Sequence, residues 1–143
     1  MSQYGLSQRT TATAAANAAW EVRSTSANKP KIMTCGFSQN AATAGAYGVG
    51  RPGAIGITPT SPQTFVDESD GNAPTASTVA AVAWGTGPTV PANFNRRYSC
   101  AATIGVGFAE NFPWGLGLPI SGSVVLWIIA TAPVGDAYAA VDE

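Results

Sequence analysis

Residues 123–130 read Ser-Val-Val-Leu-Trp-Ile-Ile-Ala, the strongest strand pattern in the chain. Apolar side chains fall on both faces of this predicted strand, whereas an outer strand of a sandwich needs only one apolar face. The second face therefore requires a cover. A loop of the same chain could supply it, or a second subunit could pack on Val125, Trp127 and Ile129.

Further strand patterns lie on both sides of this stretch, separated by turns rich in glycine and proline. No segment has the apolar stripe of a helix. The chain is therefore expected to be all-β, an antiparallel β-sandwich or jelly roll of about eight strands, with an immunoglobulin-like sandwich as the alternative. The other predicted strands cover residues 20–23, 31–37, 54–58, 78–84, 93–101, 103–112 and 137–141.

The first part of the chain differs from the rest, because residues 1–19 are mostly small and polar. They are expected to form a flexible or extended N-terminal arm, which becomes ordered on a neighbouring molecule. Residues 20–143 are expected to form a single β-sandwich domain. Between the strands, residues 38–63 form a long connection rich in glycine, proline, alanine and threonine. A connection of that length usually carries contacts or function.

The composition argues against catalysis. The 143 residues contain no histidine, so neither a Ser-His-Asp nor a Cys-His arrangement is possible. The eight acidic residues lie mostly in predicted loops, where no pair is expected to converge as a glycosidase needs. The acidic stretch 67–72 lacks the spacing of an EF-hand and is expected to be a solvated turn. We therefore expect no catalytic residues, no bound metal and no cofactor.

Charge and hydropathy limit the partners in a similar way. The net charge is −1, without the basic footprint that nucleic acid requires, and the apolar runs are too short to span a membrane. The N-terminus lacks the pattern of a signal peptide, which predicts synthesis in a cytoplasm. Cys35 and Cys100 have no metal-binding or redox spacing and are expected to be free buried thiols rather than a disulfide.

Several residues are candidates for contacts with other molecules. Gly105 and Gly107 share one face of a predicted strand, where glycine lets another backbone or ring approach closely, so they join the candidate subunit interface. Trp114 lies in a predicted loop, either as a plug for the sandwich or as a contact hot spot. The other candidate partner contacts are Tyr4, Arg9 and Arg51. A loop arginine such as Arg51 can equally bond its own chain.

The order of several short segments resembles small structural proteins of tailed phages, and in particular capsid decoration (cement) proteins. The segments are residues 19–23 (AWEVR), 28–30 (NKP), 50–59 (GRPGAIGITP), 82–86 (VAWGT) and 125–127 (VLW), together with Pro88, Pro91, Arg96 and Arg97. The resemblance implies a non-enzymatic protein on the surface of the virion capsid. It would bind the major capsid protein, stabilise the shell and form a homo-oligomer, with a trimer favoured over a dimer. It implies neither a nucleic-acid partner nor a membrane.

Two other functions remain open. A receptor- or glycan-binding head of a phage fibre would use exposed aromatic side chains, for which Trp114, Tyr47 and Trp84 are the candidates. A hydrolase of cell-wall sugars would need Glu110 together with an acid of the 67–70 cluster.

Overall fold

The protein is described by a computed structural model, which covers residues 2–11, 16–25, 29–69, 71–131 and 134–143. The all-β prediction is confirmed, although the structure has thirteen strands instead of about eight. The described residues form no helix, and hence none that could cross a membrane. The strands are β1 (Gln3–Arg9), β2 (Asn17–Ser24), β3 (Lys31–Gln39), β4 (Gly45–Pro52), β5 (Ile57–Pro59), β6 (Gln63–Thr64), β7 (Val66–Asp67), β8 (Thr78–Ala81), β9 (Trp84–Thr86), β10 (Pro91–Cys100), β11 (Gly107–Gly117), β12 (Ser123–Ala130) and β13 (Gly135–Asp142).

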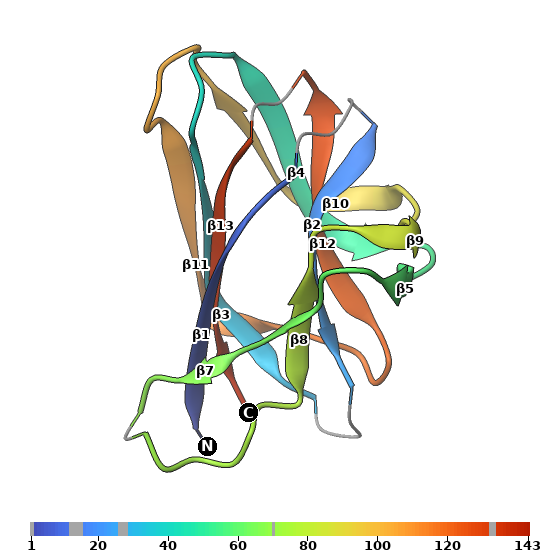
Figure 1. Ribbon diagram of the computed structural model, residues 1–143, viewed down its shortest axis with the longest axis vertical. Coiled ribbons are helices and arrows are strands. Elements are labelled where there is room, and N and C mark those ends of the chain that lie inside the picture. Colours follow the sequence, from blue (N-terminus) through green and yellow to red (C-terminus); the bar gives the residue numbers. More distant parts are fainter. Residues whose placement is uncertain (1, 12–15, 26–28, 70, 132–133) are drawn as a thin grey trace.

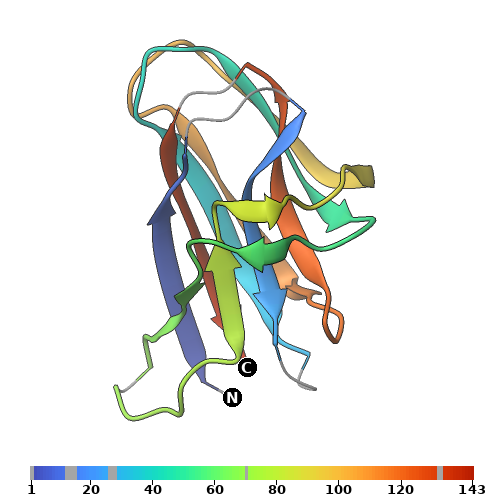
Figure 2. The ribbon, with the colours of Figure 1, turned by 45° about the vertical axis from the view of Figure 1, so that its right-hand side comes forward.

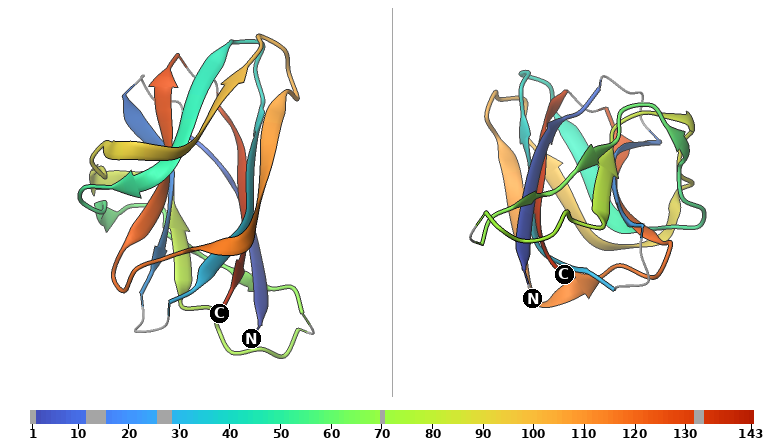
Figure 3. Two further views of the ribbon diagram at one scale, coloured as in Figure 1. Left: turned by 180° about the vertical axis from the view of Figure 1, so that it is seen from behind. Right: turned by 60° about the horizontal axis from the view of Figure 1, so that its bottom comes forward.

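The strands form two facing sheets (Figure 1). One sheet has the order β11-β3-β13-β1-β7 and the other the order β10-β4-β12-β2-β8-β6. The eight long strands pair from the outside of the sequence inward, all antiparallel: β1 with β13, β2 with β12, β3 with β11 and β4 with β10. Successive pairs alternate between the two sheets. This nesting is the jelly-roll topology, and Figure 3 shows the sheets from behind and from one end.

The core fills the space between the sheets with the inward-facing side chains of alternating positions. Aromatic rings pack at its centre, with the ring centroids of Phe37 and Tyr47 4.6 Å apart and those of Tyr98 and Phe108 stacked at 3.8 Å. Cys35 and Cys100 are free and buried, as expected from their spacing.

A third layer covers the outer face of β12. The strands β5 and β9 pair with each other and lie across the six-stranded sheet (Figure 2). Trp84 of β9 and Phe94 of β10 pack against Val125 and Trp127, whose exposed fractions are 0% and 7%. The second cover that residues 123–130 require is thus supplied by the same chain. Val125 and Trp127 have no free surface for a second subunit, and Ile129 is half-buried in the same cluster.

The strand β4 was not expected, because its sequence Gly-Ala-Tyr-Gly-Val-Gly-Arg-Pro reads as a loop. Its glycines allow close approach from outside the sheet. A Cβ at Gly48 would collide with the ring of Phe94, and one at Gly50 would lie 2.9 Å from the carbonyl oxygen of Asn93. Glycine in a central strand often marks such an approach. The glycines that make the sequence of β4 resemble a loop are therefore the residues that leave room for the atoms of β10.

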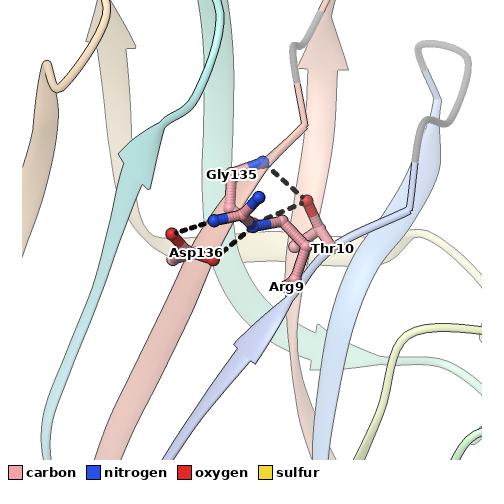
Figure 4. Close-up of polar contacts among 4 residues, drawn as sticks. All are labelled: Arg9, Thr10, Gly135 and Asp136. Carbon is pink, nitrogen blue, oxygen red and sulfur yellow. Dashed lines mark hydrogen bonds and ion pairs between the residues drawn. The ribbon is translucent and has the colours of Figure 1, made fainter.

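Residues 17–19 of the expected N-terminal arm begin β2, and residues 1 and 12–15 of it lie outside the described residues. Residues 3–9 form the strand β1 of the five-stranded sheet. It pairs with β13 along its full length and with β7 on its other side. Tyr4 is 4% exposed and belongs to the core, so it cannot contact a partner as expected. At the other end of β1, Arg9 forms a two-pronged ion pair with Asp136, and the amide of Gly135 donates to Thr10 (Figure 4).

The predicted strand 103–112 begins later than expected. Gly105 lies in an exposed turn with φ +82°, a conformation that favours glycine, and β11 starts only at Gly107. A Cβ at Gly107 would collide with the carbonyl of Phe37 on the paired strand β3. Gly107 thus serves the packing of its own chain, and the two glycines do not share one strand face as predicted.

Candidate functional site

The most exposed large apolar side chain of the described residues is Trp114, at 89%. It lies on an irregular part of β11, because the pairing with β3 breaks between Asn111 and Leu116. Next to it, Gly115 has φ +70°. An irregularity of this kind redirects side chains relative to a regular ladder. Trp114 thus lies where the regular strand pairing is interrupted and points its side chain to solvent.

Beside this bulge lies a groove at one end of the sandwich, where the last part of β11 crosses from one sheet towards the other (Figure 3). Lys29, Lys31 and Arg51 line it, together with residues 117–120. Arg51 donates from Nη2 to the carbonyl oxygen of Gly117 at 2.7 Å, which ties β4 to the end of β11. The stem of Lys31 lies over Gly115, since a Cβ there would be 2.7 Å from the Lys31 Cβ. We call these residues, with Trp114, the end surface.

The loop that closes the groove is held by backbone hydrogen bonds. The amide of Leu118 donates to the carbonyl of Pro30 at 2.8 Å, and the amide of Gly122 donates to that of Pro119 at 2.9 Å. Leu118 is buried, whereas Ile120 is 54% exposed. The loop thus presents one apolar side chain next to three cations in a defined conformation.

The predicted partner contacts fall into two groups. Arg51 and Trp114 both belong to the end surface, where Arg51 also bonds its own chain as the alternative interpretation held. Tyr4 lies in the core, and Arg9 is at the far end of β1, paired with Asp136. This pairing lowers the pKa of Asp136 through the hydrogen bond and charge of the guanidinium.

Lys29, Lys31 and Ile120 were not singled out from the sequence. The two lysines flank Pro30, while Ile120 follows Pro119 almost ninety positions later. Because the bond from Leu118 to Pro30 brings these two segments together, only the fold shows that they form one surface. A cation next to a proline turn is too common a pattern to indicate a site by itself.

The acids considered for hydrolysis are far apart. Glu110 lies on β11 and Asp67 on β7, at opposite edges of the five-stranded sheet. Four strand spacings separate them, roughly 19 Å, whereas the two carboxyl groups of a glycosidase lie within about 10 Å. Glu110 instead accepts hydrogen bonds from Tyr98 at 2.7 Å and Arg96 at 3.0 Å, which lower its pKa.

In the acidic stretch 67–72, the side chain of Asp67 bonds residues that follow it in the chain. Its carboxylate accepts from the amide and hydroxyl of Ser69 and from the amide of Ala73, and these bonds lower its pKa. Asp70 lies outside the described residues. Within the described part of the chain, no group of three or more Cys, Asp or Glu residues is placed to hold a metal ion.

Glu21 is a buried carboxylate, 1% exposed, on the outer face of β2. It accepts from the amide of Gly56 at 3.1 Å and from the hydroxyl of Ser123 at 2.6 Å. It therefore ties the β5–β9 layer to the six-stranded sheet. Its partners are the backbone and a side chain of the same chain, so the contacts that it makes are structural.

Two of the three aromatic residues considered for glycan binding pack within their own chain. Tyr47 is fully buried, and Trp84 packs over Val125 and Trp127 with its indole nitrogen enclosed. Burial also raises the pKa of Cys35 to about 12 and that of Cys100, which suppresses their thiolate forms.

One cavity between the two sheets is too small to hold a substrate. This cavity measures about 20 Å³ and is lined by apolar groups such as Trp20, Val49 and Leu126. It is comparable in size to a single water molecule. The end surface is therefore the candidate functional site that the described residues support best. Comparison with known proteins found no matching family model, no matching curated protein and no matching solved structure.

Proposed function

We propose that this chain is a non-enzymatic structural protein of a phage virion, which binds the outer face of the capsid shell through the end surface and stabilises the shell. The observation that carries the proposal is Trp114, 89% exposed on the irregular part of β11 and followed by Gly115, which the stem of Lys31 covers. Tryptophan and arginine are the residues most enriched at binding hot spots. The sequence resemblance to capsid decoration proteins supplies the shell as the partner.

The jelly roll suits this role physically. A protein that binds the assembled shell and not its free subunits shifts the equilibrium towards the intact shell by mass action. Repeated copies on one lattice would also gain from multivalency if the protein is a trimer or dimer. Such an oligomer needs a surface other than Val125 and Trp127, because the chain itself covers both residues.

Co-sedimentation with capsid shells purified without this protein tests the proposal. We expect the wild-type chain to pellet with the shells and Trp114→Ala to bind at least tenfold more weakly, as truncation of a hot spot does. Ile104→Ala is the matched control, since Ile104 is also exposed, at 65%, in a turn away from the end surface. Wild-type protein that stays in the supernatant would exclude shell binding. Equal losses in both variants would exclude the end surface.

A glycan-binding head of a phage fibre is the second candidate, favoured by the free indole face of Trp114. This candidate is weakened because the ring of Tyr47 is fully buried and that of Trp84 packs partly against the sheet. Binding to a glycan panel that disappears in Trp114→Ala, combined with no binding to shells, would favour this candidate over the first.

A further inference from the structure

We propose that the groove of the end surface binds an acidic protein segment that carries an apolar side chain. This assignment rests on the proposed function for its biological setting, because it specifies what the shell protein would present. The argument has three parts, which concern the charge of the groove, its apolar component and the hydrogen bonds around it.

The charge of the groove is positive. Three of the seven Lys and Arg residues of the chain line it, namely Lys29, Lys31 and Arg51. The ion pairs found among the described residues use Arg9 and Arg96 instead. No carboxylate belongs to the described lining of the groove. A chain with net charge −1 thus concentrates unpaired cations at one end, where they can attract an anionic partner.

One acidic residue lies near the groove and reduces its positive charge. Asp142 of β13 is the register partner of Lys31 on β3, so both lie on the outer face of the same sheet. It forms no ion pair within 4.0 Å among the described residues, and it is not part of the groove lining. The summed formal charge of the three cations of the groove and Asp142 is therefore still positive.

The apolar component of the groove distinguishes a peptide from a nucleic acid. Leu118, Pro119 and Ile120 form one wall, and Ile120 is 54% exposed. Most protein contacts to a nucleic acid go to its phosphates and sugars, and these contacts need the cations but not an aliphatic wall. An acidic segment with a leucine or similar side chain can cover the wall while its carboxylates meet the cations.

Hydrogen bonds within the chain also hold the backbone around the groove. Arg51 is held by Gly117, Leu118 by Pro30 and the loop by the bond between Gly122 and Pro119. A site already in its bound conformation avoids part of the entropy cost of ordering. Arg51 retains free guanidinium donors, since the structure gives one bond from Nη2.

Fluorescence anisotropy tests the groove without any shell. The probe is a fluorescein-labelled peptide of sequence Glu-Asp-Glu-Leu-Leu-Asp-Glu-Asp, titrated with the full chain at low salt. We expect saturable binding that the double variant Lys29→Ala/Lys31→Ala weakens roughly tenfold, through the loss of two charge contacts. Ile120→Ser should weaken binding several-fold through the loss of apolar contact. A peptide in which serine replaces both leucines should bind wild-type protein correspondingly more weakly.

The matched control is Arg9→Ala, which removes one positive charge at the opposite end of β13 from Lys31. It should bind the peptide as the wild-type chain does. The proposal is overturned if the peptide does not bind, if the lysine variant binds unchanged, or if Arg9→Ala weakens binding as much. Tighter binding of single-stranded oligo(dT) with the same variant dependence would also overturn it, in favour of a nucleic acid.

The same variants separate this proposal from the proposed function. Peptide binding without shell binding would leave the groove assignment intact and exclude the capsid role. Shell binding that is unchanged in Lys29→Ala/Lys31→Ala, with no peptide binding, would leave the capsid role intact and exclude the groove.

Discussion

A buried carboxylate without a cationic partner requires compensation, and Glu21 receives it from the third layer. The amide of Gly56 and the hydroxyl of Ser123 each donate to it. Hydrogen bonds to a charged group contribute more than neutral ones, and a buried donor left without an acceptor is costly. The hydrogen bonds of Glu21 therefore help to hold the β5–β9 layer against the six-stranded sheet.

Replacing Glu21 by alanine is expected to lower the free energy of unfolding by about 2 kcal/mol, because two buried donors lose their acceptor. Hydrogen exchange at the Gly56 amide should accelerate as well. Glu21→Gln, which keeps an acceptor oxygen, should lose less than the alanine variant in urea denaturation. Glu68→Ala, at an exposed acid, is the control and should stay within about 0.5 kcal/mol of the wild type. Equal effects of Glu21→Ala and Glu68→Ala would contradict this role of Glu21.

Gly56 is required by the close fit of the same layer. A Cβ there would lie 2.5 Å from the Trp84 Nε1 and 2.7 Å from the Glu21 Oε2. Gly56→Ala is therefore expected to destabilise the chain by about 1–3 kcal/mol and to change the fluorescence of Trp84. In Gly85→Ala, on the paired strand, the nearest atom would be 3.5 Å from the new Cβ, so little change is expected. A thermal melt of Gly56→Ala that matches the wild-type curve would contradict this prediction, because it would show that the β5–β9 layer can accommodate the added Cβ without loss of stability.

At the scale of elements, regular alternation and turn residues predicted much of the fold. The range 123–130 coincides with β12, and the range 31–37 falls within β3. Among the strands that were missed, two are long, β1 and β4, and each was missed for a physical reason. β1 carries mostly polar and small residues and is ordered by β13, which lies at the other end of the sequence. β4 is rich in glycine and so resembles a loop, and the need for glycine at position 48 appears only when the ring of Phe94 is known to lie against it.

The candidate site was less predictable than the strands. Trp114 and Arg51 could be named from the sequence because an aromatic or an arginine in a loop is conspicuous. Their neighbours Lys29 and Ile120 could not, since their proximity depends on a contact between Pro30 and Leu118. The doubly apolar strand around Val125 was recognised correctly as needing a second cover. The sequence did not show which layer would supply that cover.

The two sheets are joined at one edge by a polar contact between β10 and β11. Tyr98 donates to Glu110, and Arg96 pairs with the same carboxylate. Both contacts lower the pKa of Glu110 from its ordinary value of 4.5. A lowered folded-state pKa contributes stability above the unfolded-state pKa, and this contribution is lost as the pH falls through the folded-state value.

Tyr98→Phe is therefore expected to raise the pKa of Glu110, as followed by NMR, and to lower the free energy of unfolding by about 1 kcal/mol at pH 7. The difference from the wild type should shrink below pH 4, where the carboxyl group becomes protonated in both proteins. Tyr138→Phe on the outer sheet face is the control and should leave the titration of Glu110 unchanged. A stability difference that stays constant from pH 7 to pH 3 would show that the contact does not act through this charge.

At the scale of the whole molecule, the jelly roll joins the two ends of the described chain. The amide of Ser2 donates to the carbonyl of Glu143, and the amide of Glu143 donates back to Ser2. The side chain of Glu143 also accepts from the amides of Ser77 and Thr78. The first strand of the chain, β1, thus lies inside the five-stranded sheet, between β13 along its full length and the two-residue strand β7. A strand in that position is part of the fold itself.

Removal of residues 1–10 distinguishes this arrangement from a free arm. A free arm could be deleted without harm, whereas loss of β1 exposes the edge of β13 and leaves the core without Tyr4. Domains are typically stable by only about 5–15 kcal/mol, so the loss of a full strand pairing and of a buried aromatic side chain removes a large part of that stability. The truncated chain is therefore expected to lose its cooperative melt and its dispersed NMR spectrum. A synthetic peptide of residues 1–11, added in excess, should restore both by strand addition. The same peptide with Tyr4→Ala should restore the melt and the spectrum far less, because it can pair with β13 but leaves the place of the Tyr4 side chain in the core empty. A truncated chain that melts like the full chain would contradict this prediction and show that residues 1–10 are an arm that the fold does not need.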